Sequence, residues 1–148
     1  AEEGEITITD EAMTRFFMPL DRSVCFVLDC LGLMQGGEVF VPKMPSMRIT
    51  DLAEAIAPAV PQRIVGIRPG EKIHETLVTA DESRHASQFP SYFSILPSFS
   101  FREAEYERGE ELPPGFAYTS DTNTDWLTAN ELSHQLDSIR TPSARPVG

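Results

Sequence analysis

The sequence predicts an α/β fold in which short strands alternate with helices. Between residues 20 and 77 the hydrophobic pattern switches between the helical period and short apolar runs, in the order helix, strand, helix, strand, helix. Glycines and prolines separate these segments. This alternation is typical of α/β organisation, and the sequence contains no internal repeat.

A strand and a long helix are expected first. Residues 5–9 (EITIT) alternate as a strand does, and a polar bend follows them. Pro19 with Asp21 then marks a helix start. We expect this helix over residues 20–34, where apolar side chains recur at helical spacing, and the glycine pair that follows ends it. Those apolar side chains are Leu20, Val24, Val27, Leu28 and Leu31.

A second strand and a second helix come next. Residues 38–42 (EVFVP) form a compact apolar run that ends in proline, and the following KMPSM is expected to be a loop. Residues 49–57 (ITDLAEAIA) predict a helix. Asp51 and Glu54 have the spacing of a capping box near its start, and two prolines close it.

The stretch RIVGIRPGEKIHETL predicts a strand, a turn and a helix in direct succession. Residues 63–67 form the short strand. The turn from Arg68 to Lys72 combines one proline, one glycine and three charges. A helix is expected to begin directly after the turn, which places His74 inside it.

The last third of the chain predicts one strand, one long loop and a terminal helix. The strand is expected over residues 92–96, and the charge-rich stretch 102–115 reads as a solvated loop. Thr128 and Glu131 form a capping box, so a helix should run to about Leu136. Residues 141–148 are expected to form a flexible tail, which leaves residues 1–140 as a single domain.

Composition limits the possible partners. The formal net charge of −11 argues against a general nucleic-acid or membrane-surface binder, because anionic polymers and lipids are repelled. The longest apolar stretch is interrupted by Asp29 and is too short to cross a bilayer. Cys25 and Cys30 are expected on different faces of one helix, as small buried residues in a reducing compartment. Cytoplasm is therefore the expected location, and no nucleic-acid or membrane partner is expected.

Several catalytic signatures are missing. The sequence has no glycine-rich phosphate loop, no G-x-S-x-G motif and no Tyr-x-x-x-Lys pair. The three histidines lack the spacing of zinc ligands, so no metal site is expected. The chain is equipped to bind a ligand and carries none of the usual groups that would react with it, so no catalytic residue is expected.

Cations suited to an anionic ligand occur where predicted elements begin or end. Arg15 precedes the long helix, and Lys43 and Arg68 each follow a strand. In open α/β folds ligands collect beyond the carboxyl ends of strands. An arginine fork matches diphosphate oxygens, and a helix starting after Glu71 would add backbone donors. The Glu71 carboxylate suits a vicinal diol. From these residues alone, an ordinary surface ion pair at Arg68 is slightly favoured over an anion site.

Four ordered blocks give the sequence a specific resemblance. They are EITITDEAMTRFFMPLDRSVCFVL, GGEVFVPKMPSMRITDLAEAI, IVGIRPGEKIHETLVTADES and YTSDTNTDWLT, and they extend over residues 5–136. This arrangement resembles the C-terminal half of the inverting UDP-N-acetylglucosamine 4,6-dehydratases. That family belongs to the extended short-chain dehydrogenase/reductases. The VPKMPSM block resembles it more than the longer membrane-attached relatives or the capsule-type epimerases.

The resemblance implies a two-part enzyme. An N-terminal Rossmann half binds NADP and carries the catalytic Tyr-x-x-x-Lys pair, and the C-terminal part closes over the UDP-sugar. The sugar C4 is oxidised, water is lost across C5–C6, and hydride returns to C6 with inversion at C5. Arg68 and Glu71 match the element that holds uridine diphosphate. Arg15 matches a second cation facing the nucleotide, and Lys43 lies in a matching segment where backbone alone could make the contact.

This sequence departs from the family pattern by lacking the glycine-rich loop, the catalytic pair and most of the parallel sheet. We therefore expect the substrate-binding portion of an extended short-chain dehydrogenase/reductase, with no cofactor and no turnover of its own. The expected partners are a UDP-sugar and the Rossmann half, and apolar surface left by that half's absence predicts a homo-oligomer. A non-catalytic scaffold, or a fragment of an epimerase or a retaining dehydratase, remains an alternative.

Overall fold

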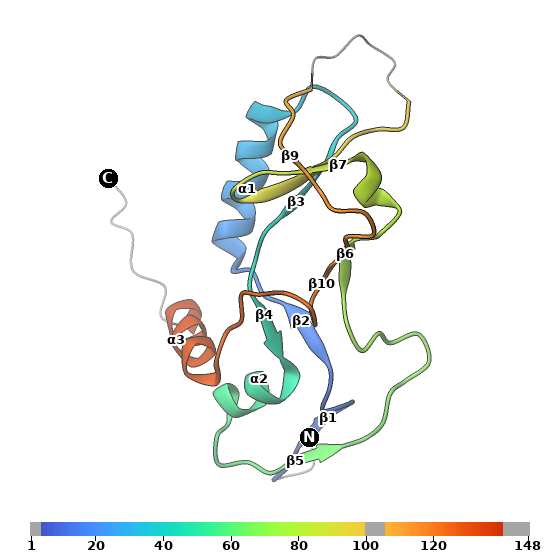
Figure 1. Cartoon of the computed structure of the whole chain (residues 1–148). Helices are drawn as coiled ribbons and strands as arrows, with labels where there is room; N and C mark the ends of the chain where they lie inside the picture. Colours follow the sequence, from blue (N-terminus) through green and yellow to red (C-terminus); the bar gives the residue numbers. More distant parts are fainter. Residues whose placement is uncertain (1–3, 100–105, 141–148) are drawn as a thin grey trace, which may run out of the picture.

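The computed structural model describes residues 4–99 and 106–140, which form a mixed α/β fold (Figure 1). The expected fold class is therefore confirmed. The helical elements are α1 (Leu20–Leu33), α2 (Ile49–Ile56), the 3₁₀ turn η1 (Glu82–His85) and α3 (Ala129–Arg140). The strands are β1 (Ile6–Ile8), β2 (Thr14–Phe16), β3 (Val39–Pro42), β4 (Ser46–Arg48), β5 (Gln62–Ile64), β6 (Thr76–Val78), β7 (Ala86–Gln88), β8 (Tyr92–Ile95), β9 (Glu110–Glu111) and β10 (Tyr118–Thr119).

The described strands form small separate sheets. The strands β1 and β5 pair in parallel, whereas β2 pairs with β4 and β6 with β10 in antiparallel fashion. The largest sheet has the order β3-β8-β7-β9 and is antiparallel throughout. Because β3 and β5 belong to different sheets, Lys43 and Arg68 do not share the carboxyl edge of one parallel sheet. The expectation that Lys43 and Arg68 meet beyond the strand ends of one parallel sheet is therefore wrong.

Aromatic side chains join the largest sheet to the β6–β10 pair. Val41, Val78, Ala86, Phe93 and Tyr118 are buried together. The Tyr118 ring lies 4.9 Å from the Phe93 ring and 4.6 Å from that of Phe16, measured between centroids. Burial of such rings is a main source of stability in a core of this size. The Tyr118 hydroxyl donates to the Met44 carbonyl at 2.8 Å and thereby fixes the chain between β3 and β4.

The helices lie where hydrophobic period and capping residues predicted them. At α3, the Thr128 amide and hydroxyl both donate to the Glu131 carboxylate, and the Glu131 amide donates back to the Thr128 hydroxyl. The predicted capping box is therefore confirmed, although the helix continues past Leu136. At α2 the capping box is wrong, because the helix begins before Asp51, with Arg48 at its N-cap and no side-chain cap. The predicted tail, residues 141–148, lies outside the described residues.

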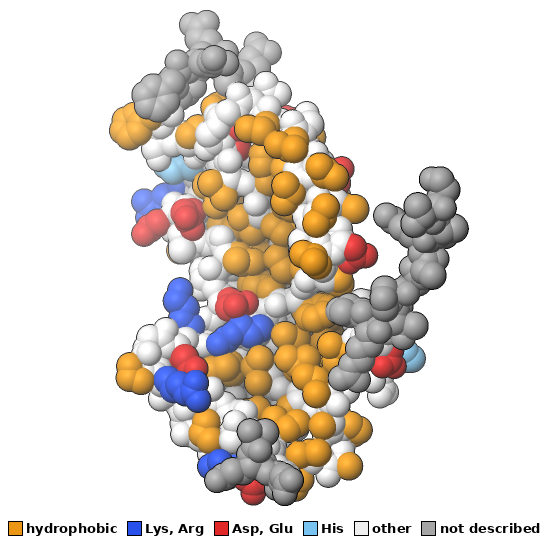
Figure 2. All heavy atoms as spheres, turned by 180° about the vertical axis from the view of Figure 1, so that it is seen from behind, with side chains coloured by type: hydrophobic (Ala, Val, Ile, Leu, Met, Phe, Trp, Pro, Cys, Tyr) orange, Lys and Arg blue, Asp and Glu red, His pale blue; other side chains and the backbone are white. Residues whose placement is uncertain are grey.

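The long helix α1 turns its apolar stripe away from the rest of the described chain. Its half-buried side includes Phe26, whose ring lies 6.4 Å from that of Tyr92. The stripe itself is exposed, with exposed fractions of Leu20 80%, Val24 51%, Val27 59%, Leu28 61% and Leu31 63%. Figure 2 shows hydrophobic side chains gathered along this side of the molecule. We call these five residues the α1 apolar face.

Three other expectations are corrected or refined. Cys25 is exposed and Cys30 half-buried, so the cysteines are not core residues, and both are free thiols. The strand expected over residues 63–67 is shorter, since pairing of β5 ends at Ile64. The expected loop 102–115 is described only from residue 106, and it contains the short strand β9. Among the described residues, no helix is long and apolar enough to cross a membrane.

Candidate functional site

The turn at Arg68–Glu71 is closed by two reciprocal hydrogen bonds. The Arg68 amide donates to the Glu71 carboxylate at 3.0 Å, and the Glu71 amide donates to the Arg68 carbonyl at 3.1 Å. Between them Pro69 fixes one bend, and Gly70 adopts φ +86°, the combination that a type II turn requires. A Cβ placed on Gly70 meets no heavy atom within 4 Å. The turn is therefore locally ordered, exposed and open to close approach.

Arg68 is exposed to solvent. Within the described ranges no acidic side chain forms an ion pair with it. The hydrogen bonds there likewise use only its backbone amide and carbonyl. Of the two readings left open by the sequence, a surface ion pair and an anion site, only the first predicts a paired acid at this position.

The segment after the turn is irregular, with a bend at residues 73–74, and the helix predicted there is wrong. Residues 71–75 enter no helix, and Thr76 begins β6. The backbone groups that a helix needs are taken by tertiary partners, since the Ile73 carbonyl accepts from the Thr14 amide at 3.0 Å. The Glu75 amide donates to the Ser120 hydroxyl at 2.9 Å. Helix N-terminal donors therefore do not contribute to an anion site here.

The Arg15 side chain contacts residues 72–75, the segment that follows the turn. Its guanidinium donates through Nη1 to the Ile73 carbonyl at 3.0 Å and through Nη2 to the Lys72 carbonyl at 2.9 Å. Its Nε lies 3.7 Å from the Glu75 carboxylate. The other oxygen of that carboxylate accepts from the Phe16 amide at 2.9 Å. Strand β2 and the segment before β6 are consequently joined by a charged and hydrogen-bonded connection.

A buried polar chain lies behind this connection. The Thr14 hydroxyl is 2.9 Å from His74 Nδ1 and 2.7 Å from the Ser120 hydroxyl. Thr14 and Ser120 are both buried, and the Ser120 amide donates to the Glu75 carbonyl. The Thr119 hydroxyl lowers the pKa of the neighbouring Asp121, and the charge of His74 adds to that effect. This network could not be predicted from the sequence, because its members are 45 to 106 residues apart and match no motif.

Lys43 lies at a separate place. Its ammonium sits over the Phe93 ring, 4.9 Å from the centroid, and its amide donates to the Ser91 carbonyl at 2.9 Å. It lines a hollow of about 550 Å³ together with Tyr118 and Asn123. Burial raises the pKa of the Tyr118 hydroxyl, which keeps that group neutral as a donor. Any contact made by Lys43 must come from its carbonyl or its side chain, since the amide is taken.

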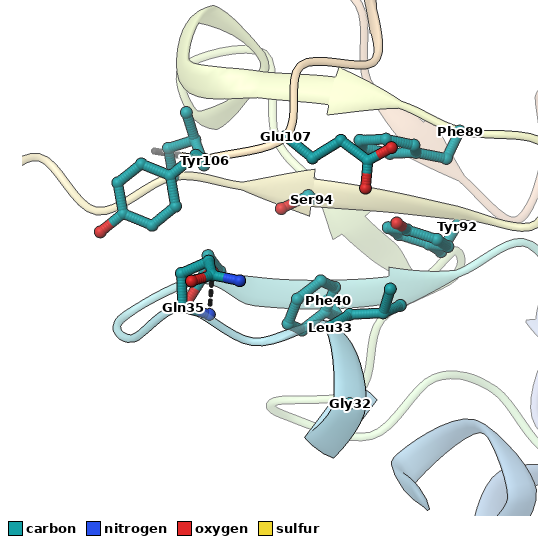
Figure 3. Close-up of a pocket in the computed structure, with 11 residues that line it drawn as sticks. Gly32, Leu33, Gln35, Phe40, Phe89, Tyr92, Ser94, Tyr106 and Glu107 are labelled. Carbon is teal, nitrogen blue, oxygen red and sulfur yellow. Dashed lines mark hydrogen bonds between the residues drawn. The ribbon is translucent and has the colours of Figure 1, made fainter. Parts of the chain in front are cut away.

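Another hollow, of about 490 Å³, lies between the end of α1, β3, β8 and Glu107 (Figure 3). Its walls are aromatic, with the Phe89 and Tyr92 rings stacked 4.6 Å apart. Figure 3 shows the Glu107 carboxylate directed toward these rings. Its charged lining residues are Glu38 and Glu107, so its electrostatics oppose a diphosphate. None of the four predicted ligand-binding residues lines it.

The structure thus brings the predicted site residues together only in part. Arg68 and Glu71 share one turn. Arg15 donates hydrogen bonds to the carbonyls of Lys72 and Ile73, the next two residues in the sequence. No described contact joins Lys43 to that group. Among the described residues, no group of three or more histidines, cysteines or acids could hold a metal ion. The arrangement offers charge and hydrogen bonds for recognition.

The comparisons with known proteins identify the family. The model of the family described as polysaccharide biosynthesis protein matches residues 1–97, which include β1 to β8 and the Arg68–Glu71 turn. The chain belongs to this family. It is 43% identical over 136 residues to a UDP-N-acetylglucosamine 4,6-dehydratase (inverting) of Campylobacter jejuni, covering 86% of this chain and 41% of the relative. The resemblance drawn from the four sequence blocks is therefore confirmed.

Two other similarities place the chain more broadly. It is 38% identical over 95 residues to a UDP-glucose 4-epimerase of Rickettsia massiliae, covering 62% of this chain and 28% of the relative. The X-ray structure of Pen from Bacillus thuringiensis superposes with a TM-score of 0.75 and 28% identity. That match covers 94% of this chain and 41% of the other. The chain spans about two fifths of the length of the dehydratase and of Pen.

Proposed function

We propose that this chain is the UDP-sugar-binding part of a nucleotide-sugar 4,6-dehydratase of the UDP-N-acetylglucosamine type, and that it does not turn over alone. The observation that carries the proposal is the Arg68–Glu71 turn, exposed, open at Gly70 and within the residues that the family model matches. Arg68 binds the diphosphate through its fork, and Glu71 accepts hydrogen bonds from the ribose diol.

Local charge supports an anionic ligand despite the net charge of −11. Arg15, Arg68 and Lys72 lie on or beside the turn, and the nearest acids, Glu71 and Glu75, are both engaged in hydrogen bonds with backbone amides. The whole-chain field repels a nucleotide at long range, but it is screened within about 8–10 Å at physiological ionic strength. In this proposal Arg68 supplies the fork for the diphosphate, and Arg15 and Lys72 add positive charge beside it. Lys43 is a further candidate contact at the edge of its own hollow.

The chemistry of the reaction belongs to residues that this sequence lacks. The sequence has neither the glycine-rich loop nor the Tyr-x-x-x-Lys pair, so the residues present do not fit NADP and this chain alone binds none. A nucleotide-binding half would hold NADP, which would supply hydride transfer when bound. The part played by this chain is to hold the UDP-sugar in place for C4 oxidation and loss of water across C5–C6.

The partner of this chain is then a Rossmann-type nucleotide-binding half. The α1 apolar face has no cover in the described part of the chain, and β3, which follows α1, is an edge strand of its sheet. The longer relatives contain a further three fifths of sequence that could supply a covering surface. Without that half, the exposed face leads to self-association, so a homo-oligomer is proposed for the isolated chain. The free cysteines support a cytoplasmic location.

The experiment that tests this function combines binding with reconstitution. Saturation-transfer NMR should show UDP-N-acetylglucosamine bound to the chain alone, while incubation with NADP yields no product. Adding a separately produced nucleotide-binding half should restore formation of the dehydrated 4-keto sugar. A C4 epimer as the product supports the epimerase alternative, and failure to bind any UDP-sugar supports the scaffold alternative. Greater identity and coverage favour the dehydratase over the epimerase.

A further inference from the structure

The Arg15 guanidinium is almost completely occupied by its own chain. Besides the Ile73 and Lys72 carbonyls it donates to the Thr14 carbonyl at 2.6 Å and contacts the Met13 sulfur at 3.2 Å. An arginine has five N–H donors. Nη1 and Nη2 serve two partners each, and Nε faces Glu75. A bidentate contact between Arg15 and a diphosphate therefore requires breaking bonds that the folded chain already makes.

The partners of Arg15 lie at one end of an otherwise weakly held segment. Every residue from 61 to 70 is exposed, and beyond β5 the hydrogen bonds of this stretch to the rest of the chain include the Val65 amide to the Ile8 carbonyl at 2.9 Å. At the other end, Glu75 is fixed through its carboxylate to the Phe16 amide and through its backbone to Ser120. The Arg68–Glu71 turn lies between these ends, directly before the carbonyls that Arg15 binds.

We propose that Arg15 is a positioning residue, which acts on the nucleotide through the Lys72–Glu75 segment and fixes the Arg68–Glu71 turn. This inference rests on the proposed function for its ligand, but the contacts that carry it do not. Arg15 and Glu75 tie β2 to the base of the turn. The turn residues then meet the ligand with both the Arg68 fork and the Glu71 carboxylate already placed.

Positioning and direct contact predict different ligand patterns. If Arg15 touches the diphosphate, its replacement weakens UDP binding and leaves uridine binding unchanged, because uridine carries no phosphate. If Arg15 positions the turn, uridine binding weakens as well, because the ribose contact of Glu71 is displaced together with Arg68. UDP binding then weakens by the larger factor, since UDP also loses its contact with Arg68. The test variant is Arg15→Lys, which keeps the charge and loses the fork. Arg63→Lys is the matched control, because Arg63 pairs with Glu5 at 2.8 Å on the exposed β1–β5 edge.

Two measurements on the 148-residue chain distinguish a positioning role of Arg15 from direct contact with the diphosphate. Amide hydrogen exchange should be about tenfold faster in Arg15→Lys at Thr14 and Glu75, whose amides donate to the Ile73 carbonyl and the Ser120 hydroxyl, and unchanged in Arg63→Lys. NMR titrations with uridine and UDP should show both affinities lowered, with the larger decrease for UDP. Unchanged exchange, or loss confined to UDP, overturns the positioning role.

The same design separates this inference from the proposed function. If the wild-type chain binds neither uridine nor UDP, the proposed function fails, while the exchange rates still decide whether Arg15 holds the segment. If Arg15→Lys does not fold, Glu75→Gln replaces it, since this change weakens the same connection from the other side. Faster exchange at Thr14 in Glu75→Gln supports the positioning role, and unchanged exchange overturns it.

Discussion

The Arg68 amide and the Glu71 carboxylate are joined by a 3.0 Å hydrogen bond that closes a turn without using the arginine side chain. One carboxylate oxygen of Glu71 is taken by this bond, and the second remains for a ligand hydroxyl. The same two residues therefore shape the turn through their backbone and offer a cation and an acceptor through their side chains.

The ribose assignment of Glu71 predicts a dependence on the sugar hydroxyls. The wild-type chain should bind UDP more tightly than 2′,3′-dideoxy-UDP, by about fivefold to tenfold for a charge-assisted hydrogen bond. In Glu71→Ala this difference should disappear, because the acceptor is gone. NMR titration of the two ligands against both proteins measures it. An equal preference for UDP in Glu71→Ala and wild type contradicts the assignment.

The Gly70 conformation predicts a functional effect separable from stability. Gly70 and Gly66 adopt φ +86° and +84°, and a Cβ at either position meets no heavy atom within 4 Å. Gly70→Ala and Gly66→Ala should therefore each cost about 1 kcal/mol from backbone strain alone. Thermal unfolding should show similar losses for the two variants. Only Gly70→Ala should also weaken UDP binding, and equal UDP affinities for both would remove Gly70 from the site.

The α1 apolar face predicts self-association of the isolated chain. Sedimentation of the wild-type chain should reveal dimers or larger species at high concentration. Leu28→Lys with Leu31→Lys should shift the chain toward monomer without loss of folding, because these side chains are 61% and 63% exposed. Ile56→Lys, at a position 47% exposed on α2, is the matched control and should leave association unchanged. A clean wild-type monomer at high concentration contradicts the prediction.

The capping box of α3 predicts an acid-sensitive helix end. Hydrogen bonds from the Thr128 amide and hydroxyl lower the pKa of Glu131 below its ordinary value of 4.5. A folded-state pKa below the unfolded value adds stability above the unfolded pKa, and that stability is lost as the pH falls through the folded pKa. Circular dichroism of the wild-type chain between pH 7 and pH 2 should show helix loss below about pH 4.5. Glu131→Gln should show a smaller acid-dependent change, and an identical pH profile contradicts the role.

How much the sequence could predict depended on the range of the interactions involved. The helices α1, α2 and α3 follow from the local hydrophobic period, and at α3 Thr128 with Glu131 form the predicted cap. Thr79 and Glu82 form a second capping box with the same spacing at η1, where no helix is predicted from the sequence. Strands such as β2 and β4 are three residues long, and only their mutual pairing makes them strands.

The site was predictable in its residues but only partly in its geometry. Turn chemistry and the family blocks located Arg68 and Glu71, because proline, glycine and charge stand next to each other in the sequence. The stretch after Glu71 has the composition of a helix, but tertiary hydrogen bonds with Arg15 and Ser120 occupy its backbone groups, and it is irregular. Periodicity located the α1 apolar face without indicating whether this chain would cover it. Contacts between segments distant in the sequence cannot be predicted from local residue spacing.

Calorimetric titration with UDP tests the central claim most directly, with Arg68→Ala as the test variant. Arg63→Ala is the control, because it removes an exposed arginine whose partner, Glu5, lies away from the turn. The wild-type chain and Arg63→Ala should bind UDP at millimolar concentration with similar affinity. Arg68→Ala should bind about tenfold more weakly, since a charge-assisted fork to the diphosphate is lost. No binding at millimolar UDP, with Arg68→Ala indistinguishable from wild type, contradicts a UDP-binding role for this turn.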